Sequence, residues 1–173
     1  IECSNSAKII LNGCCLNNSD LILKNSVFRD KASIEMSKLT MSENATLEFD
    51  SVIINSDTLT FKGAKLFGRT TFNRTIFPEY VDFRFVKIGL VDVYFTWVKA
   101  PEGKKIIIAL WGSDIAKIRL NNKFELWFPD DLSTDEQKLV YSRILSKYRN
   151  ENNDYLYEYF VKESKKSFNL KHK

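Results

Sequence analysis

The fold is decided by the stretch Phe67-Gly68-Arg69-Thr70-Thr71-Phe72-Asn73-Arg74-Thr75-Ile76-Phe77. A phenylalanine recurs here at every fifth position, and a threonine stands two positions before the second and the third phenylalanine. A spacing of five matches neither the 3.6-residue period of a helix nor the two-residue period of a strand. The stretch therefore predicts a chain that turns a corner every five residues and points one large side chain inward on each short side.

The same spacing continues on both sides of this stretch. The large residues before it are Ile34, Leu39, Asn44, Phe49, Ile54, Leu59 and Ala64, of which Asn44 and Ala64 fit poorly, and those after it are Phe83, Ile88, Val93 and Val98. Four such sides make a coil of about 20 residues with backbone ladders to its neighbours. We therefore expect Ile54 to stack on Ile34 within a solenoid of about four coils, above the working minimum of about three.

An antiparallel sandwich of alternating strands is the competing fold. Such a fold needs frequent hairpin turn signals. Residues 27–98 contain one proline, Pro78, and no Asn-Gly or Asp-Gly pair. The sequence therefore favours the solenoid.

The repeats resemble those of the pentapeptide-repeat family, most closely in the stretch from Phe67 to Phe77. The resemblance covers residues 27–98 and implies a right-handed quadrilateral β-helix. A second resemblance lies in Leu139-Val140-Tyr141, in 148–154 and in Tyr157-Glu158-Tyr159-Phe160. These residues are similar to a helical pair that closes certain bacterial envelope-type members, some of which continue into membrane helices or ion-channel segments. This likeness implies a prokaryotic source and proximity to a membrane.

The chain is expected to divide into two parts. Residues 1–131 form the β-solenoid, with residues 1–26 as its N-terminal edge segment and irregular strands at 105–111, 115–120 and 124–128 as its end. Residues 132–173 form a C-terminal helical pair with a mobile basic tail from 164 onward. Ser133 and Glu136 match a capping box at the start of the first helix. Apolar stripes at helical spacing follow on both helices.

The charge of the 173-residue chain is unevenly distributed. The formal net charge is +4, and the surplus lies in residues 138–173, while the preceding part is nearly neutral. A basic segment can meet nucleic acid or an anionic membrane surface, or it can be a solvated helix face. Binding of nucleic acid is not expected, because the segment contains no recognised module, and mimicry of DNA would need a longer, acidic rod.

The start of the chain bears on its location in the cell. The first residue is Ile rather than Met, which indicates a processed or truncated protein whose signal peptide or flanking membrane helices would not be visible. Cys3 can pair with either Cys14 or Cys15, and such a disulfide suits an exported protein. An exported or cell-envelope protein is therefore favoured over a cytoplasmic one. No apolar run is long enough to span a membrane; the longest, residues 105–111, has the size of a strand.

Residues suited to catalysis are scarce. The only histidine is His172, next to the last residue, which excludes a histidine-based triad within a pocket. No phosphate loop, dinucleotide fingerprint or zinc-ligand pattern is present, so neither a cofactor nor a metal is expected. Asp82 and Asp92 stand two sides apart on a square coil and would face opposite ways. An enzyme is therefore not expected.

Aromatic residues gather near the end of the solenoid and form the candidate interaction surface. They are Tyr94, Trp97, Trp111 and Trp127. Exposed aromatic side chains can bind a protein or a sugar, but they can also fill the junction between the solenoid and the helices.

The predicted function is a non-catalytic scaffold or protein-interaction module, placed near the cell envelope and binding a protein partner of unknown identity. The alternative is a soluble domain of a membrane-attached sensor or channel protein. A glycan-active β-helix enzyme is the third hypothesis. End-to-end stacking of solenoids would make a homodimer.

Overall fold

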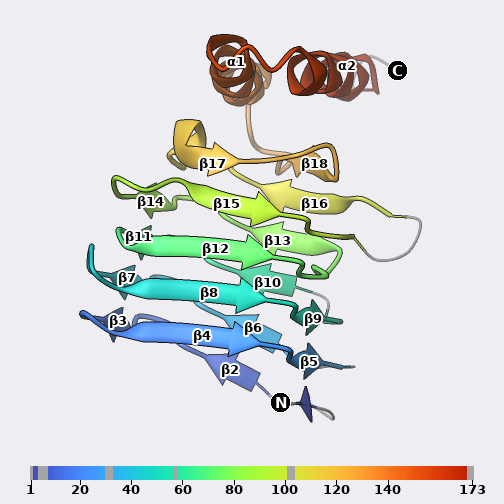
Figure 1. Ribbon diagram of the computed structural model, residues 1–173. Coiled ribbons are helices and arrows are strands. Elements are labelled where there is room, and N and C mark those ends of the chain that lie inside the picture. The colour runs from blue at the N-terminus through green and yellow to red at the C-terminus, as the bar shows by residue number, and fades with distance from the viewer. Residues whose placement is uncertain (1, 4–7, 30–32, 57, 101–103, 171–173) are drawn as a thin grey trace.

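A computed structural model describes residues 2–3, 8–29, 33–56, 58–100 and 104–170. The chain winds as a parallel β-solenoid of about four turns, and two helices follow the last turn. Figure 1 shows the chain running along one side and returning behind it as it climbs from the N-terminus, so the solenoid is right-handed. The predicted fold class is confirmed.

Four parallel sheets line the solenoid, and we name them A to D. Sheet A contains β1 (Glu2–Cys3), β5 (Val27–Phe28) and β9 (Ile53–Ile54). Sheet B contains β2 (Lys8–Ile10), β6 (Ser33–Glu35), β10 (Thr58–Thr60), β13 (Tyr80–Asp82), β16 (Ile106–Ala109) and β18 (Phe124–Trp127). Sheet C contains β3 (Cys15–Leu16), β7 (Thr40–Met41), β11 (Lys65–Leu66) and β14 (Lys87–Ile88). Sheet D contains β4 (Asp20–Lys24), β8 (Thr46–Asp50), β12 (Arg69–Asn73), β15 (Val93–Thr96) and β17 (Ile118–Arg119).

The predicted stacking at intervals of 20 residues is wrong. Ile34 pairs with Leu59 rather than with Ile54, and Leu59 in turn pairs with Val81. These partners are 25 and 22 positions apart. The coils differ in length because the corners between sheets C and D and between sheets A and B hold different numbers of residues.

Left-handed backbone turns form the other two corners, whose length is constant. Between sheets B and C the residues with positive φ are Gly13, Lys38, Gly63, Phe85 and Gly112, and after sheet D they are Asn25, Ser51, Arg74 and Trp97. The turns stack because an amide of one coil donates to a carbonyl of the next, as from Lys38 N to Lys62 O at 2.9 Å and from Ser51 N to Asn73 O at 2.9 Å. This conformation is favourable for glycine and strained for most other residues. Both corners therefore recur in successive coils whether or not the residue is glycine.

The interior is filled by inward-facing side chains in columns. Phe49, Phe72 and Phe95 are in register on three successive strands of sheet D. Their ring centroids are 5.0 Å apart at each step, with the rings stacked. Most of the large residues in the five-residue rows are buried, whereas Asn44 and Phe67 are exposed. The spacing therefore identified most of the core, although it misjudged the length of the coil.

Both ends of the predicted solenoid are regular in the structure. The expected N-terminal edge segment supplies β2, β3 and β4, which pair in register with β6, β7 and β8. The expected terminal strands continue the same ladders as β16, β17 and β18, with a short 3-10 helix, η1 (Ile115–Lys117), before β17.

Cys14 and Cys15 are exposed and unbridged. The side chain of Cys3 lies outside the described residues, as does His172.

The two helices, α1 (Thr134–Asn150) and α2 (Asp154–Leu170), close the C-terminal end of the solenoid. The predicted capping box is present, with Ser133 and Glu136 each accepting from the other's backbone amide. The hydroxyls of Tyr148 and Tyr159 donate to the carbonyls of Leu120 and Phe124, at 2.7 and 2.8 Å. An uncovered sheet edge exposes unpaired backbone groups, so these contacts protect the last coil.

The cap also buries a lysine. Lys147 Nζ donates to the carbonyls of Ala116 and Ile118, at 2.9 and 2.8 Å. Burial lowers the pKa of Lys147 to about 8, and nearby Arg119 acts in the same direction.

Neither helix is long and apolar enough to cross a membrane.

Candidate functional site

The C-terminal half of sheet B carries an aromatic and apolar outer surface. Tyr80 on β13 and Ile107 on β16 are paired residues in the ladder. Asp82, Ala109 and Trp127 form the next outward row across β13, β16 and β18. Paired residues of a sheet project from the same face. We name the group Tyr80, Asp82, Arg84, Ile107 and Trp127 the sheet B patch.

Trp127 is the centre of this patch. Its ring meets the ring of Tyr80 edge to face, with centroids 5.7 Å apart and an interplanar angle of 86°. The guanidinium carbon of Arg84 lies 5.8 Å from the centroid of the Trp127 ring, within cation–π range. The indole remains 37% exposed. It therefore presents a large side chain held on two sides and open to solvent on another.

An ion pair fixes the cationic side of the patch. Arg84 Nε donates to Asp82 Oδ1 at 2.9 Å, and Arg84 Nη2 donates to Asp82 Oδ2 at 2.6 Å. Asp82 Oδ1 also accepts from the backbone amide of Arg84 at 3.0 Å. The bond to Asp82 raises the pKa of Arg84. Asp82 is 6% exposed and fully engaged, so this carboxylate orients the arginine rather than offering itself to a substrate.

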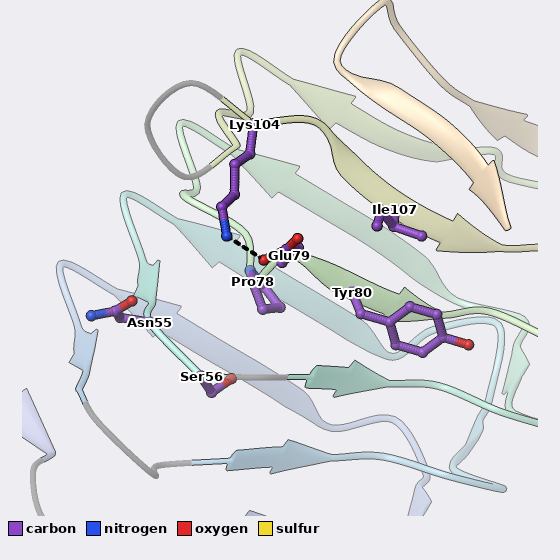
Figure 2. Close-up of a pocket in the computed structure, with 7 residues that line it drawn as sticks. All are labelled: Asn55, Ser56, Pro78, Glu79, Tyr80, Lys104 and Ile107. Carbon is purple, nitrogen blue, oxygen red and sulfur yellow. Dashed lines mark hydrogen bonds and ion pairs between the residues drawn. The ribbon is translucent and has the colours of Figure 1, made fainter. Parts of the chain in front are cut away.

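A hollow of about 480 Å³ lies beside the patch. Its lining includes two patch residues, Tyr80 and Ile107, and the remaining lining residues are Asn55, Ser56, Pro78, Glu79 and Lys104. Figure 2 shows Lys104 and Glu79 pointing toward each other on one side, with Tyr80 and Ile107 on the other. The Lys104 Nζ to Glu79 Oε2 distance is 2.5 Å. Burial raises the pKa of the Tyr80 hydroxyl, with the Asp82 charge acting in the same direction, so this group stays a neutral donor. The hollow thus has Tyr80 and Ile107 on one side and the ion pair of Lys104 with Glu79 on the other.

The four aromatic residues proposed from the sequence do not form one surface. Trp127 belongs to the sheet B patch, whereas Tyr94 projects from β15 in sheet D. Trp97 follows β15 at the next corner, is 78% exposed and has a φ of 58°.

Trp111 has a different environment again. It follows β16, and its ring packs edge to face on Phe85 with centroids 4.3 Å apart. Its buried Nε1 has no hydrogen-bond partner among the described residues. Trp111 thus fills a corner of the solenoid rather than joining the sheet B patch.

Sequence reasoning missed the residues that surround Trp127. Tyr80 and Arg84 come close to Trp127 because Asp82 pairs with Ala109, 27 positions later, and Ala109 pairs with Trp127, 18 positions later. No fixed period connects them. The alternation of Tyr80, Asp82 and Arg84 after Pro78 is the one local signal of an outward polar and aromatic row.

No group of His, Cys, Asp and Glu suited to a metal ion occurs among the residues that the structure describes. Comparison with known proteins found no matching family model, no matching curated protein and no matching solved structure.

Proposed function

We propose that this chain is a non-catalytic interaction module and that the sheet B patch binds a protein partner. The observation that carries the proposal is Trp127, exposed but held between Tyr80 and an arginine that is itself fixed by Asp82. Tryptophan, tyrosine and arginine dominate the energetics of protein interfaces, mostly near the centre of the contact. All three meet here, Tyr80 and Trp127 on strands of one sheet and Arg84 in the turn after β13.

Rigidity of the patch supports the proposal. Four of its five residues stand on three hydrogen-bonded strands, and Arg84, in the turn after β13, is fixed by two bonds from its guanidinium to one carboxylate. A side chain fixed before binding loses less conformational entropy on association. The neighbouring hollow can take one apolar side chain of the partner beside Tyr80 and Ile107, which suits a contact with a central anchor.

The state of the carboxylates favours a module without catalysis over a glycan-active enzyme. Glycoside cleavage needs two carboxyl groups that can exchange protons or attack. Asp82 is engaged by Arg84, Glu79 by Lys104 and Asp92 by Arg119. Purified protein should give no turnover on neutral or acidic polysaccharides, and turnover that disappears in Glu79→Gln would contradict this part of the proposal.

The narrower resemblance and the location belong to the proposal as well. The pentapeptide-repeat likeness is supported by the buried five-residue rows, but the steps of 22 and 25 residues depart from that family's square coil. Membership in this family and a bacterial, cell-envelope location remain predictions. Their direct test is fractionation of the source cells with the intact mass of the chain measured in each fraction.

Partner binding can be tested with matched tryptophan variants. Protein captured from source cells on wild-type chain and identified by mass spectrometry should be lost in Trp127→Ala and retained in Trp97→Ala. Both variants remove an exposed indole, but Trp97 lies at the corner after β15 of sheet D and outside the sheet B patch. Circular dichroism and thermal unfolding of both variants would confirm that they fold. Equal capture by Trp127→Ala and wild type would contradict the proposal.

A further inference from the structure

Sheet C carries a row of exposed lysines that the overall charge conceals. Lys65 on β11 and Lys87 on β14 are paired residues and project outward from adjacent strands. Lys38 and Lys62 stand at the B–C corner of two coils, where Lys38 N donates to Lys62 O. We name Lys38, Lys62, Lys65 and Lys87 the lysine row. Like charges at directly paired positions of a sheet are destabilising, so this arrangement does not serve the fold.

The lysine row is poorly neutralised by the protein itself. Lys38, Lys62 and Lys65 form no ion pair with any residue that the structure describes, and Lys87 approaches Asp114 at 3.7 Å. Asp114 Oδ2 already accepts from the Ile88 amide. Glu43, in the turn that follows β7, forms no ion pair with these lysines within the part of the chain that the structure describes. The row therefore has a positive field that an anionic partner can satisfy.

Four exposed apolar side chains flank the lysines. Phe85 precedes β14 and is 41% exposed, and Leu90 follows β14 and is 87% exposed. Val91 and Phe67 are also exposed, at the same corner as Leu90. A Cβ on Gly89 would lie 2.7 Å from Phe67 Cα, so the two coils touch at this corner. We name Phe67, Phe85, Leu90 and Val91 the apolar tips.

We propose that sheet C is a docking face for an anionic lipid bilayer, with the lysine row at the headgroups and the apolar tips in the interface. Basic residues near an anionic leaflet and apolar side chains inserted at the headgroup boundary act together in peripheral binding. Both occur here on one side of the solenoid and within one coil, from Phe85 through Lys87 to Leu90.

The form of the surface favours a bilayer over an acidic protein. A specific protein interface packs to the density of a protein interior and needs matching knobs and pockets. The apolar tips lie on turns, and none of them lines the hollow beside Tyr80 or the second hollow, of about 410 Å³, beside Lys117 and Arg143. A fluid headgroup layer accepts projecting side chains without a matching pocket.

Flotation of the full chain with vesicles tests the proposal. Wild type should float with phosphatidylcholine vesicles that contain about 30% phosphatidylserine, and not with phosphatidylcholine alone. Raising the salt from about 0.02 to about 0.5 M should release it. Lys65→Gln should lower the partition coefficient about fivefold, and Leu90→Ser about tenfold.

Matched controls separate the sheet C face from other basic or apolar groups. Leu139→Ser removes a leucine that is 50% exposed on α1, and the pair Lys162→Gln and Lys165→Gln removes two charges from α2. Both controls should bind vesicles as wild type does. Binding lost equally in the controls would overturn the proposal, as would equal binding to neutral vesicles. Binding to a polyglutamate resin without binding to vesicles would assign the face to an acidic protein instead.

Discussion

The outer surfaces of sheets B and D differ in chemistry although the same coils build both. Charges on the sheet D side are paired between neighbouring coils, as in Lys24 with Glu48 and Arg119 with Asp92. On sheet B the single ion pair of the patch, Arg84 with Asp82, lies beside Trp127 and Tyr80. The inward residues of both sheets are apolar apart from Thr70 on β12. The comparison teaches that the ladder and the core determine the fold, while the outward residues are free to specify function.

The core beneath both surfaces should give the largest effect. Phe72 stacks between Phe49 and Phe95 and also contacts Phe61, Phe77 and Phe83. Phe72→Ala should lower the free energy of unfolding by about 3–5 kcal/mol, because it removes a fully buried ring and leaves a cavity. Urea denaturation would measure this change. A loss below about 1 kcal/mol would contradict the packed column.

The ion pairs of the two sheets should respond differently to the same substitution. Asp82→Ala should cost about 2–3 kcal/mol, because it leaves a largely buried arginine without its acceptor. Asp50→Ala on sheet D should cost clearly less, since its partner Arg74 is well exposed and screened by water. Thermal unfolding of the two variants would compare them directly. Equal losses of stability in Asp82→Ala and Asp50→Ala would contradict the expected difference between the two ion pairs.

The ends of the two sheets should differ in their response to pH. At the end of sheet D, Lys147 of α1 donates to the carbonyl of Ile118, and its pKa is lowered to about 8 from 10.5. At the end of sheet B, the neutral hydroxyl of Tyr159 donates to the carbonyl of Phe124. Between about pH 8 and pH 10 the unfolded chain binds more protons at Lys147, so stability should rise by about 1–2 kcal/mol.

A methionine variant isolates this effect. Lys147→Met should remove the rise in stability between pH 8 and pH 10, as measured by urea denaturation across that range. Above pH 10 stability should fall in both proteins, because burial raises the pKa of Tyr141 to about 12 while the unfolded tyrosine ionises near 10. A stability that falls from pH 8 in wild type would contradict the buried cation.

Relief of backbone strain at Trp97 should give the smallest effect. Its φ of 58° lies in the left-handed region, which asparagine tolerates better than tryptophan. Because the side chain is 78% exposed, its removal loses little packing. Trp97→Asn should raise the free energy of unfolding by up to about 1 kcal/mol, as measured by urea denaturation. A clear loss of stability would show that this indole supports the fold.

Much of the fold could be predicted because inward side chains recur locally. The five-residue spacing identified Ile34, Phe72 and Val98 as core residues, and all three are buried. The capping box at Ser133 located the start of α1. The length of the coil could not be predicted, since it changes between sheets C and D, where Met41 and Leu47 are six positions apart but Leu66 and Thr70 only four, and no sequence signature marks this difference.

The candidate site was predicted only in part for a related reason. Trp127 was identified as an exposed aromatic residue, but its neighbours Tyr80 and Arg84 come from β13 and from the turn after it, two steps away in the ladder. The lysine row was concealed because residues 1–137 are nearly neutral in total, while the structure gathers lysines on sheet C and pairs many acidic residues elsewhere. Sequence counts do not show which face of a solenoid a charge occupies.

Photo-crosslinking at equivalent outward positions of the two sheets tests the central claim most directly. A photoreactive amino acid would replace Ile107 on sheet B or Thr71 on sheet D, in otherwise identical chains expressed in the source cells. We predict a discrete crosslinked partner from position 107 and none from position 71, with the product at 107 lost on adding Trp127→Ala. Crosslinking from position 71 alone, or equally from both positions, would contradict the assignment of function to sheet B.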